Sequence, residues 1–331
     1  MRLRWIVVCV GFLLPSLWLA GTALLYALLP EFRGSGTAFG LALFLAVVLT
    51  VGATLTWRAG WRRRLLYLAS VETLLLAQIA ILLGWAYLSF GFGTRQQKIE
   101  VTAEWMRPLE SRWAIQSPGK DHSVRTVSDV RRGTEDSLRF ELRAGEMYCD
   151  LFGKRSFRSE VNTREFVPMG SERWYSFSLL LPPDFPMEKN RLVLAQWHGA
   201  DKKYLAEPSR SPSLAFRYSG GRFFITIRHS EERIVRDPQV VSSQKLFETP
   251  EFPLGVWHDF VVQAKWSYQA DGFVNVWWND HQIVYYHGPV GYNDDLGPYF
   301  KFGLYRDDSA RTYVAYFNHV KSGVRRADVD F

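Results

Sequence analysis

The sequence predicts an all-β sandwich preceded by three transmembrane helices. Long apolar stretches dominate the first 92 residues, whereas apolar and polar residues alternate later in the chain, with turn residues every ten or so positions. No long amphipathic helix is evident after residue 100, and strands without intervening helices favour a sandwich or jelly roll over a parallel sheet. We therefore divide the chain into a membrane module (1–92), a linker (93–110) and an extracytoplasmic β domain (111–331).

Three apolar stretches are long enough to cross a bilayer, whose core requires about 20 residues in helical form. They cover about residues 5–29, 37–57 and 65–92. The first follows a basic start, as a signal peptide would, but it is too long, lacks a clear cleavage site and precedes two further stretches. We expect it to be retained, so that the protein binds the lipid bilayer as a multi-pass membrane protein.

Arginines next to these stretches predict their orientation. Arg2 and Arg4 precede the first stretch and four arginines lie within 58–64, whereas the connection at 30–36 has one arginine and one glutamate. The positive-inside rule then places the N-terminus in the cytoplasm and the β domain in the periplasm or outside the cell, with the helices in a bacterial inner membrane. Glu72, within the third stretch, either reaches water at the cytoplasmic boundary or contacts a membrane partner.

The distribution of charge argues against a nucleic-acid partner. The whole chain has a formal charge of +7, and residues 1–95 contain eight arginines and two glutamates, which gives +6 for that part. The rest of the chain is therefore close to neutral, at +1. Because the basic excess is explained by loops beside membrane helices, we expect no binding to nucleic acid.

Alternation predicts the strands of the β domain. Strands are expected at 137–142, 173–181, 191–198, 258–267, 299–306 and 312–320. Two hairpins are expected, one at 213–229 with a turn at Ser219–Gly221 and one at 273–288 with a turn at Asn279–Asp280. Cys149 is expected to be a small core residue.

Three polar rows lie on these or neighbouring segments, because residues two apart in a strand share a face. The rows are Arg158, Glu160 and Asn162; Gln196 and His198; and Tyr299, Lys301, Gly303 and Tyr305. Each row alone is typical of a solvated face. Together they supply a cation, an amide, an imidazole and two phenols, which suits the binding of an anionic sugar and the transfer of a proton. The glycine in the third row would let a ligand approach the backbone.

These rows also resemble a known family. RSEVNT (158–163), QWH (196–198) and YFKFGLY (299–305) resemble, in this order, the three strand motifs of jelly-roll polysaccharide lyases, including alginate lyases. SLRFELRAGE (137–146) and GVWHDFVVQAKWS (255–267) look closer to the heparin lyase I and glucuronan lyase group. The resemblance covers about residues 130–322 and implies a concanavalin-like jelly roll that cleaves an acidic, uronate-containing polysaccharide by β-elimination.

The resemblance also implies roles for individual residues. Tyr305 would donate a proton to the leaving oxygen, and either Tyr305 or His198 would remove the proton on C5 of the uronate. Arg158, Gln196 and His198 would neutralise the carboxylate. Substrate binding falls to Lys301, Tyr299, Glu160, Asn162 and Arg164. In this set Glu160 would orient Arg158, and Arg164 would substitute for a family arginine whose position is occupied by Asn162.

Other enzyme classes fit less well. A glycoside hydrolase of related fold commonly has an E-x-D-x-x-E strand, but no glutamate in this chain is followed two residues later by aspartate. The seven histidines show no metal-ligand spacing, so we expect no metal site and no cofactor. The acidic pairs Asp294–Asp295 and Asp307–Asp308 leave calcium open, although paired aspartates are usual in turns.

The main alternative is a non-catalytic, membrane-tethered carbohydrate-binding module for an acidic exopolysaccharide. Its sugar-stacking residues would be the aromatic side chains Trp266, Trp277, Trp278, Tyr285 and Tyr286. Such a module needs no tyrosine beside an imidazole and a guanidinium. Burial of Tyr305 and His198 in the core, or a wide separation between them, would therefore favour the binding module over the lyase.

Overall fold

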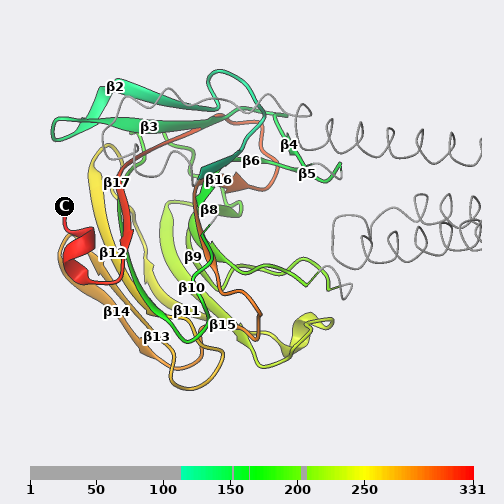
Figure 1. Cartoon of the computed structure of the whole chain (residues 1–331). Helices are drawn as coiled ribbons and strands as arrows, with labels where there is room; N and C mark the ends of the chain where they lie inside the picture. The colour runs from blue at the N-terminus through cyan, green and yellow to red at the C-terminus, as the bar shows by residue number, and fades with distance from the viewer. Residues whose placement is uncertain (1–112, 151–152, 164, 203–206) are drawn as a thin grey trace, which may run out of the picture. The chain divides into compact units, whose positions relative to one another are not determined.

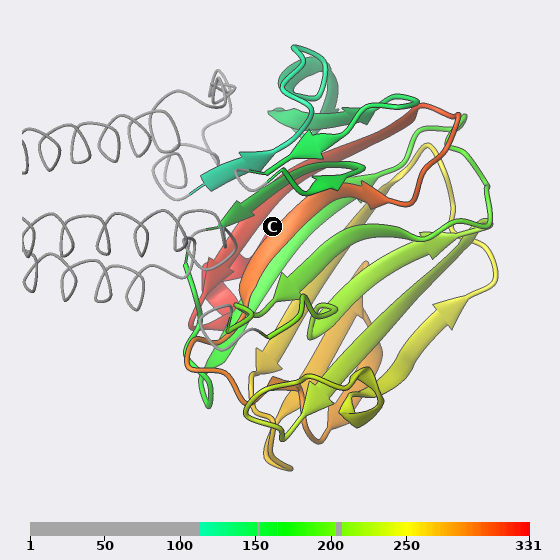
Figure 2. The same cartoon turned by 90° about the vertical axis from the view of Figure 1, so that its right-hand side faces the viewer.

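Two sheets stacked face to face form the β domain (Figure 1). The computed structural model describes residues 113–150, 153–163, 165–202 and 207–331. The eight-stranded sheet has the order β1 (Trp113–Gln116), β6 (Arg158–Thr163), β16 (Tyr299–Arg306), β8 (Leu192–His198), β9 (Leu214–Ser219), β10 (Arg222–Ser230) and β11 (Ser242–Thr249), and the short β15 (Gly291–Tyr292) pairs with β10. Figure 2 looks onto the outer face of this sheet.

The seven-stranded sheet forms the second layer. Its order is β14 (His281–His287), β13 (Phe273–Trp278), β12 (Trp257–Lys265), β7 (Glu172–Leu180), β17 (Tyr313–Gly323), β3 (Glu135–Leu142) and β2 (Val124–Arg132). The remaining elements are a ribbon of β4 (Tyr148–Cys149) with β5 (Arg155–Ser156), and the short 3₁₀ helices η5 (Pro238–Val240) and η6 (Arg326–Val329). The predicted all-β sandwich is confirmed.

The predicted membrane module lies outside the described residues. This applies to the stretches at 5–29, 37–57 and 65–92, to Glu72 and to the linker at 93–110. Across 113–331, apart from the short gaps named above, no helix has the length and apolar character needed to cross a bilayer.

Alternation along β16 separates the core from the outer face. Phe300, Phe302 and Leu304 are at most 2% exposed. The Phe302 ring packs edge-on against Phe140 and at a tilt against Phe317, both of the seven-stranded sheet, with centroid separations of 5.6 Å and 5.1 Å. Full burial of each such side chain contributes on the order of 1.5–3 kcal/mol. Because the side chains alternate, the same register directs the polar residues of β16 to the outer face.

Both predicted hairpin turns are present, and each uses the backbone conformation that a two-residue loop requires. Gly220 and Gly221 have φ of 59° and 82°, and Asn279 and Asp280 have φ of 47° and 63°. Positive φ at both central positions matches the twist of the flanking strands.

Two sequence interpretations are corrected by the structure. Cys149, expected in the core, is exposed on the short strand β4. Gly303, expected to admit a ligand, lies in an irregularity of the β16–β8 pairing with φ of +128°. A Cβ atom at this position would collide with the Ser159 carbonyl oxygen and lie 2.8 Å from the Phe140 ring. Close packing against β6 and the core therefore requires the glycine.

Candidate active site

A cavity of about 300 Å³ lies on the outer face of the eight-stranded sheet. Its lining includes six of the residues selected from the sequence: Arg158, Gln196, His198, Tyr299, Lys301 and Tyr305. They meet because β16 lies between β6 and β8 in the sheet, although these strands are far apart in the chain. Tyr305 is opposite Arg158 on β6, Lys301 is opposite Gln196 on β8, and Tyr299 is opposite His198.

A buried carboxylate below the cavity organises its cations. Glu160 is 1% exposed, and its Oε2 lies 3.0 Å from Lys301 Nζ and 3.4 Å from an Arg158 terminal nitrogen. The Gln196 amide donates a hydrogen bond to Glu160 Oε1. A buried carboxylate is tolerated only when such partners compensate its lost hydration. The contact through which Glu160 would orient Arg158 is thus present.

Gln116 adds an acceptor that the sequence analysis did not identify. Its side-chain oxygen accepts hydrogen bonds from Lys301 Nζ at 2.6 Å and from Arg158 at 2.9 Å. It belongs to the edge strand β1, where it pairs with Glu160 of β6. Burial lowers the pKa of Lys301 to about 8, a shift that the charge of Glu160 opposes and that of Arg158 increases.

The Tyr305 ring lies between two guanidinium groups. The Arg158 Cζ atom is 4.1 Å from the ring centroid and the Arg191 Cζ atom is 4.5 Å from it. Arg191 is held in turn by Asp307 Oδ1, which accepts hydrogen bonds of 2.6 Å and 2.8 Å from it. These contacts fix the ring and place positive charge beside the phenol. Arg191, which directly precedes β8, was not among the residues selected from the sequence.

His198 is oriented by the main chain. Its Nδ1 lies 2.7 Å from the Gly199 carbonyl oxygen and its Nε2 lies 3.1 Å from that of Arg210. Burial, with a contribution from the charge of Lys301, lowers the pKa of the imidazole. A neutral imidazole donates from only one nitrogen, and here both nitrogens face carbonyl oxygens. In the neutral form one of the two nitrogens therefore faces a carbonyl oxygen without a proton to donate.

The other expected binding residues have different positions. Tyr299 lines the cavity, and burial, followed by the charge of Glu160, raises its pKa to about 12. Asn162 is 9% exposed and donates to the Thr163 carbonyl at 3.3 Å, beside the cavity rather than in its lining. Arg164 lies outside the described residues.

Two further arginines line the cavity from the hairpin of β9 and β10. Arg217 and Arg228 were not selected from the sequence. The alternation that places Phe216 in the core directs Arg217 to the opposite face, so the sequence did contain a signal for it. Burial, increased by the charges of Arg228 and Arg191, lowers the pKa of Arg217 to about 10.

One aspartate of each acidic pair considered for calcium forms ion pairs with basic side chains. Asp294 forms ion pairs of 2.9 Å with Lys202 and with Arg210, and Asp307 pairs with Arg191. Within the described ranges, no three His, Cys, Asp or Glu side chains are grouped so that they could hold a metal ion.

The aromatic residues considered for sugar stacking do not gather at the cavity. Trp266 is fully buried in the core. Trp277, on β13, stacks on Trp174 with a centroid separation of 5.7 Å, and Tyr285, on β14, is 73% exposed. Both strands belong to the seven-stranded sheet. Tyr305 and His198, by contrast, line the same cavity and are not in the core. They lie toward opposite ends of it, because His198 is opposite Tyr299 and Tyr305 is six positions further along β16.

Comparisons with solved structures found proteins to which this chain is similar. An endo-β-1,4-glucuronan lyase from the fungus Trichoderma reesei is 18% identical and shares the fold with a TM-score of 0.53, over 70% of this chain and 95% of that one. The alginate lyase vAL-1 from a Chlorella virus is 14% identical with a TM-score of 0.46, over 69% of this chain and all of the other. A comparison with curated protein sequences found no match.

The family is shown by a sequence comparison. The family model described as polysaccharide lyase matches residues 92–321, more than half of the chain. The chain therefore belongs to the polysaccharide lyase family and is an enzyme of that class.

Proposed function

We propose that this enzyme is a membrane-anchored lyase that cleaves a uronate-containing polysaccharide by β-elimination. The observation that carries the proposal is the position of Tyr305. Its ring lies between Arg158 and Arg191 on the wall of a cavity that also contains Lys301 and Gln196. A proton-transfer group beside fixed cations and an amide is what elimination from a uronate requires.

The carboxylate of the uronate would bind above the buried network. Lys301, Gln196 and Arg158 supply positive charge and hydrogen-bond donors there, and Glu160 fixes their positions. As the C5 proton leaves, negative charge spreads onto the carboxylate, where preorganised donors stabilise it most. These side chains supply the charge stabilisation in our proposal, which requires no metal ion.

Tyr305 would serve as both base and acid. In its phenolate form it takes the C5 proton, the electrons of the C5–H bond form a C4–C5 double bond, and the C4–O4 bond breaks. The departing O4 then receives the proton from Tyr305, which returns to the phenolate form. The two products are a new chain end with a free hydroxyl and an unsaturated uronate.

The function is tested with the full-length chain in detergent and a panel of glucuronan, alginate, heparin and hyaluronan. We expect ultraviolet absorbance from the unsaturated uronate on at least one polymer. Tyr305→Phe should lower the rate by about 10²–10⁴-fold, as expected when acid–base catalysis is lost. Tyr285→Phe removes an exposed hydroxyl from the seven-stranded sheet, away from the cavity, and serves as the control. Binding of a polymer without any absorbance would favour a carbohydrate-binding module, and a fully active Tyr305→Phe variant would exclude this role.

Membrane anchoring is supported by the apolar stretches at 5–29, 37–57 and 65–92 and by the arginines between the last two. In this arrangement the β domain lies in the periplasm or outside a bacterial cell and acts on a polymer exported or assembled at the inner membrane. Protease added to spheroplasts should digest the β domain and spare a tag placed before Arg2. Protection of the β domain would reverse this topology, and extraction of the chain by alkaline carbonate would exclude the anchoring.

A further inference from the structure

Two arginines of the cavity have no acidic partner among the residues that the structure describes. Arg217 is 7% exposed, and its Nε donates a 2.9 Å hydrogen bond to Thr226, which is also buried. Arg228 has a buried terminal nitrogen that donates no hydrogen bond. Neither guanidinium forms an ion pair with a carboxylate in the part of the chain that the structure describes. Both side chains line the cavity that contains Tyr305.

Three other buried cationic side chains of the domain contact a carboxylate, whereas the buried Arg306 donates to main-chain carbonyl oxygens instead. Lys202 and Arg210 each contact Asp294 at 2.9 Å, and Lys301 contacts Glu160 at 3.0 Å. A buried charge without a counter-charge is costly, and the nearby positive charge of Arg228 adds repulsion at Arg217. A negatively charged group from a ligand would remove both costs.

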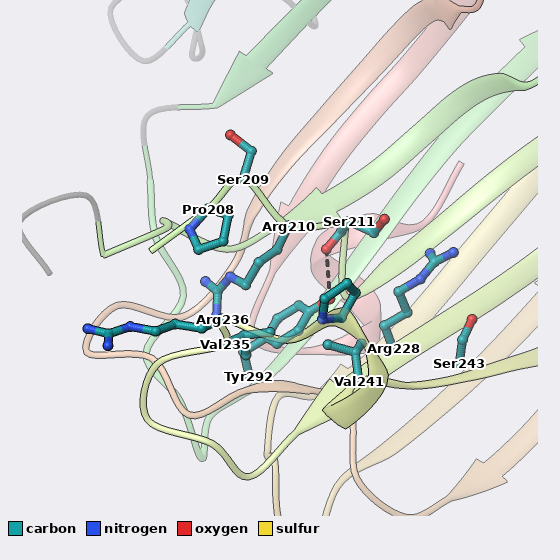
Figure 3. Close-up of a pocket in the computed structure, with 11 residues that line it drawn as sticks. Pro208, Ser209, Arg210, Ser211, Arg228, Val235, Arg236, Val241, Ser243 and Tyr292 are labelled. Atoms are coloured by element: carbon teal, nitrogen blue, oxygen red, sulfur yellow. Dashed lines mark hydrogen bonds between the residues drawn. The ribbon is translucent and has the colours of Figure 1, made fainter. Parts of the chain in front are cut away.

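The space around these arginines extends beyond the site of elimination. A second cavity of about 440 Å³ adjoins the first and shares Arg228 and the segment 209–211 with it. Figure 3 shows Arg228 at one end of this second cavity and Arg236 at the other, with Arg210 between them. The polar surface thus continues along a path that a chain of sugars could follow.

The sheet register separates the two arginines from the proposed carboxylate site. Lys301 is opposite Gln196, which is opposite Ala215, two residues before Arg217 on β9. Two strand spacings, about 10 Å in total, therefore lie between β16 and β9. Arg228 lies one strand further away, on β10. At these separations Arg217 and Arg228 would contact a different acidic group from the one held by Lys301.

We propose that Arg217 and Arg228 form a second anion subsite, which binds a carboxylate or sulfate on a sugar near the uronate that is cleaved. The identity of this ligand as a polysaccharide rests on the proposed function. The substrate is then a polymer with acidic groups on more than one sugar of the bound segment.

The anion subsite is tested without catalysis by thermal unfolding of the full-length chain in inorganic sulfate, with sodium chloride at equal ionic strength as reference. Sulfate should raise the unfolding temperature of the unmodified protein more than that of Arg217→Gln or Arg228→Gln. Arg222→Gln is the matched control, because Arg222 lies on the same hairpin and is exposed beside Glu248. Equal stabilisation by sulfate in all four proteins would overturn the proposal.

The polymer arm uses the Tyr305→Phe background, in which binding is measured without cleavage. Removal of one charge-assisted contact should weaken the binding of an acidic oligosaccharide by roughly tenfold or more. If the variants lose more affinity for glucuronan oligosaccharides, the group bound at the subsite is a carboxylate. If they lose more affinity for heparin oligosaccharides, it is a sulfate. Unchanged affinity for both would overturn the subsite. If sulfate stabilises the variants less than the unmodified protein but no polymer yields an elimination product, the anion subsite is supported and the lyase proposal is rejected.

Discussion

Replacement of Glu160 by glutamine tests how the buried network is held together. The substitution keeps the shape of the side chain and an acceptor for Gln196, but leaves Lys301 and Arg158 without their buried counter-charge. Removal of one partner from a buried ion pair costs about 3–5 kcal/mol. We expect the free energy of unfolding of the β domain to fall by this amount near neutral pH.

The pH dependence of this loss follows from the pKa of Lys301, about 8 in the folded protein against an ordinary value of 10.5. Below pH 8 the lysine is charged in both states and its cost of burial is fully present. Between pH 8 and 10.5 only the unfolded chain retains the proton, so this cost is progressively removed. Without Glu160, which raises the pKa, the folded lysine loses its proton at still lower pH. The cost of Glu160→Gln should therefore shrink as the pH rises toward 8 and be smallest above it.

Denaturant unfolding followed by tryptophan fluorescence, repeated from pH 6 to pH 9, measures this loss. The double variant Glu160→Gln, Lys301→Met should recover part of it, because no lysine charge then remains unpaired. Glu248→Gln removes a carboxylate from an exposed pair on β11 and should change stability little at any of these pH values. The reasoning would be refuted if Glu160→Gln lowered the free energy of unfolding no more than the control does. It would also be refuted if the decrease were larger but did not change with pH.

Three further outcomes are expected. The KM of the enzyme should rise above pH 8 as Lys301 loses its proton, and Lys301→Arg should move this rise to higher pH; an unchanged profile in the variant would exclude the lysine as its cause. Arg191→Gln should lower kcat by roughly 10- to 100-fold with little change in KM, since Arg191 contacts the Tyr305 ring; a change confined to KM would contradict this. Burial lowers the pKa of His258, whose Nδ1 accepts a hydrogen bond from Trp278, so stability should fall as the pH drops below 6.5, the ordinary value for histidine. His258→Gln should flatten this fall, and an equally steep curve in the variant would assign the fall to other groups.

The sequence could predict the polar rows because strand periodicity is a local property. Residues two apart share a face whatever the strand pairs with, so Lys301 and Tyr305 could be placed on one side of β16 from the chain alone. The same rule applied to the hairpin of β9 and β10 would have found Arg217. The interpretation of Gly303 failed because a glycine in a strand has several causes, and only the packing of β16 on β6 identifies the cause here.

The site residues that were not found from the sequence are brought to the cavity by the order of the strands in the sheet. Sequence periodicity does not reveal that order. Gln116 reaches Lys301 only because β1 pairs with β6 at the edge of the sheet, and β6 pairs with β16 from the other end of the chain. Arg191 contacts Tyr305 because the ends of β8 and β16 lie side by side, with Asp307 at the end of the pair. Such contacts between distant segments appear only once the sheet is assembled.

The distribution of charge also depends on the assembled sheet. The β domain is nearly neutral, and for this reason its composition argued against a nucleic-acid partner. Yet seven lysines and arginines line the cavity that contains Tyr305, and only two carboxylates line it. Folding therefore concentrates positive charge on one face, and a low-dielectric wall strengthens its field. The choice of an acidic polymer as substrate depends on this local excess, to which Arg217 and Arg228 contribute charge that no carboxylate in the described part of the chain neutralises.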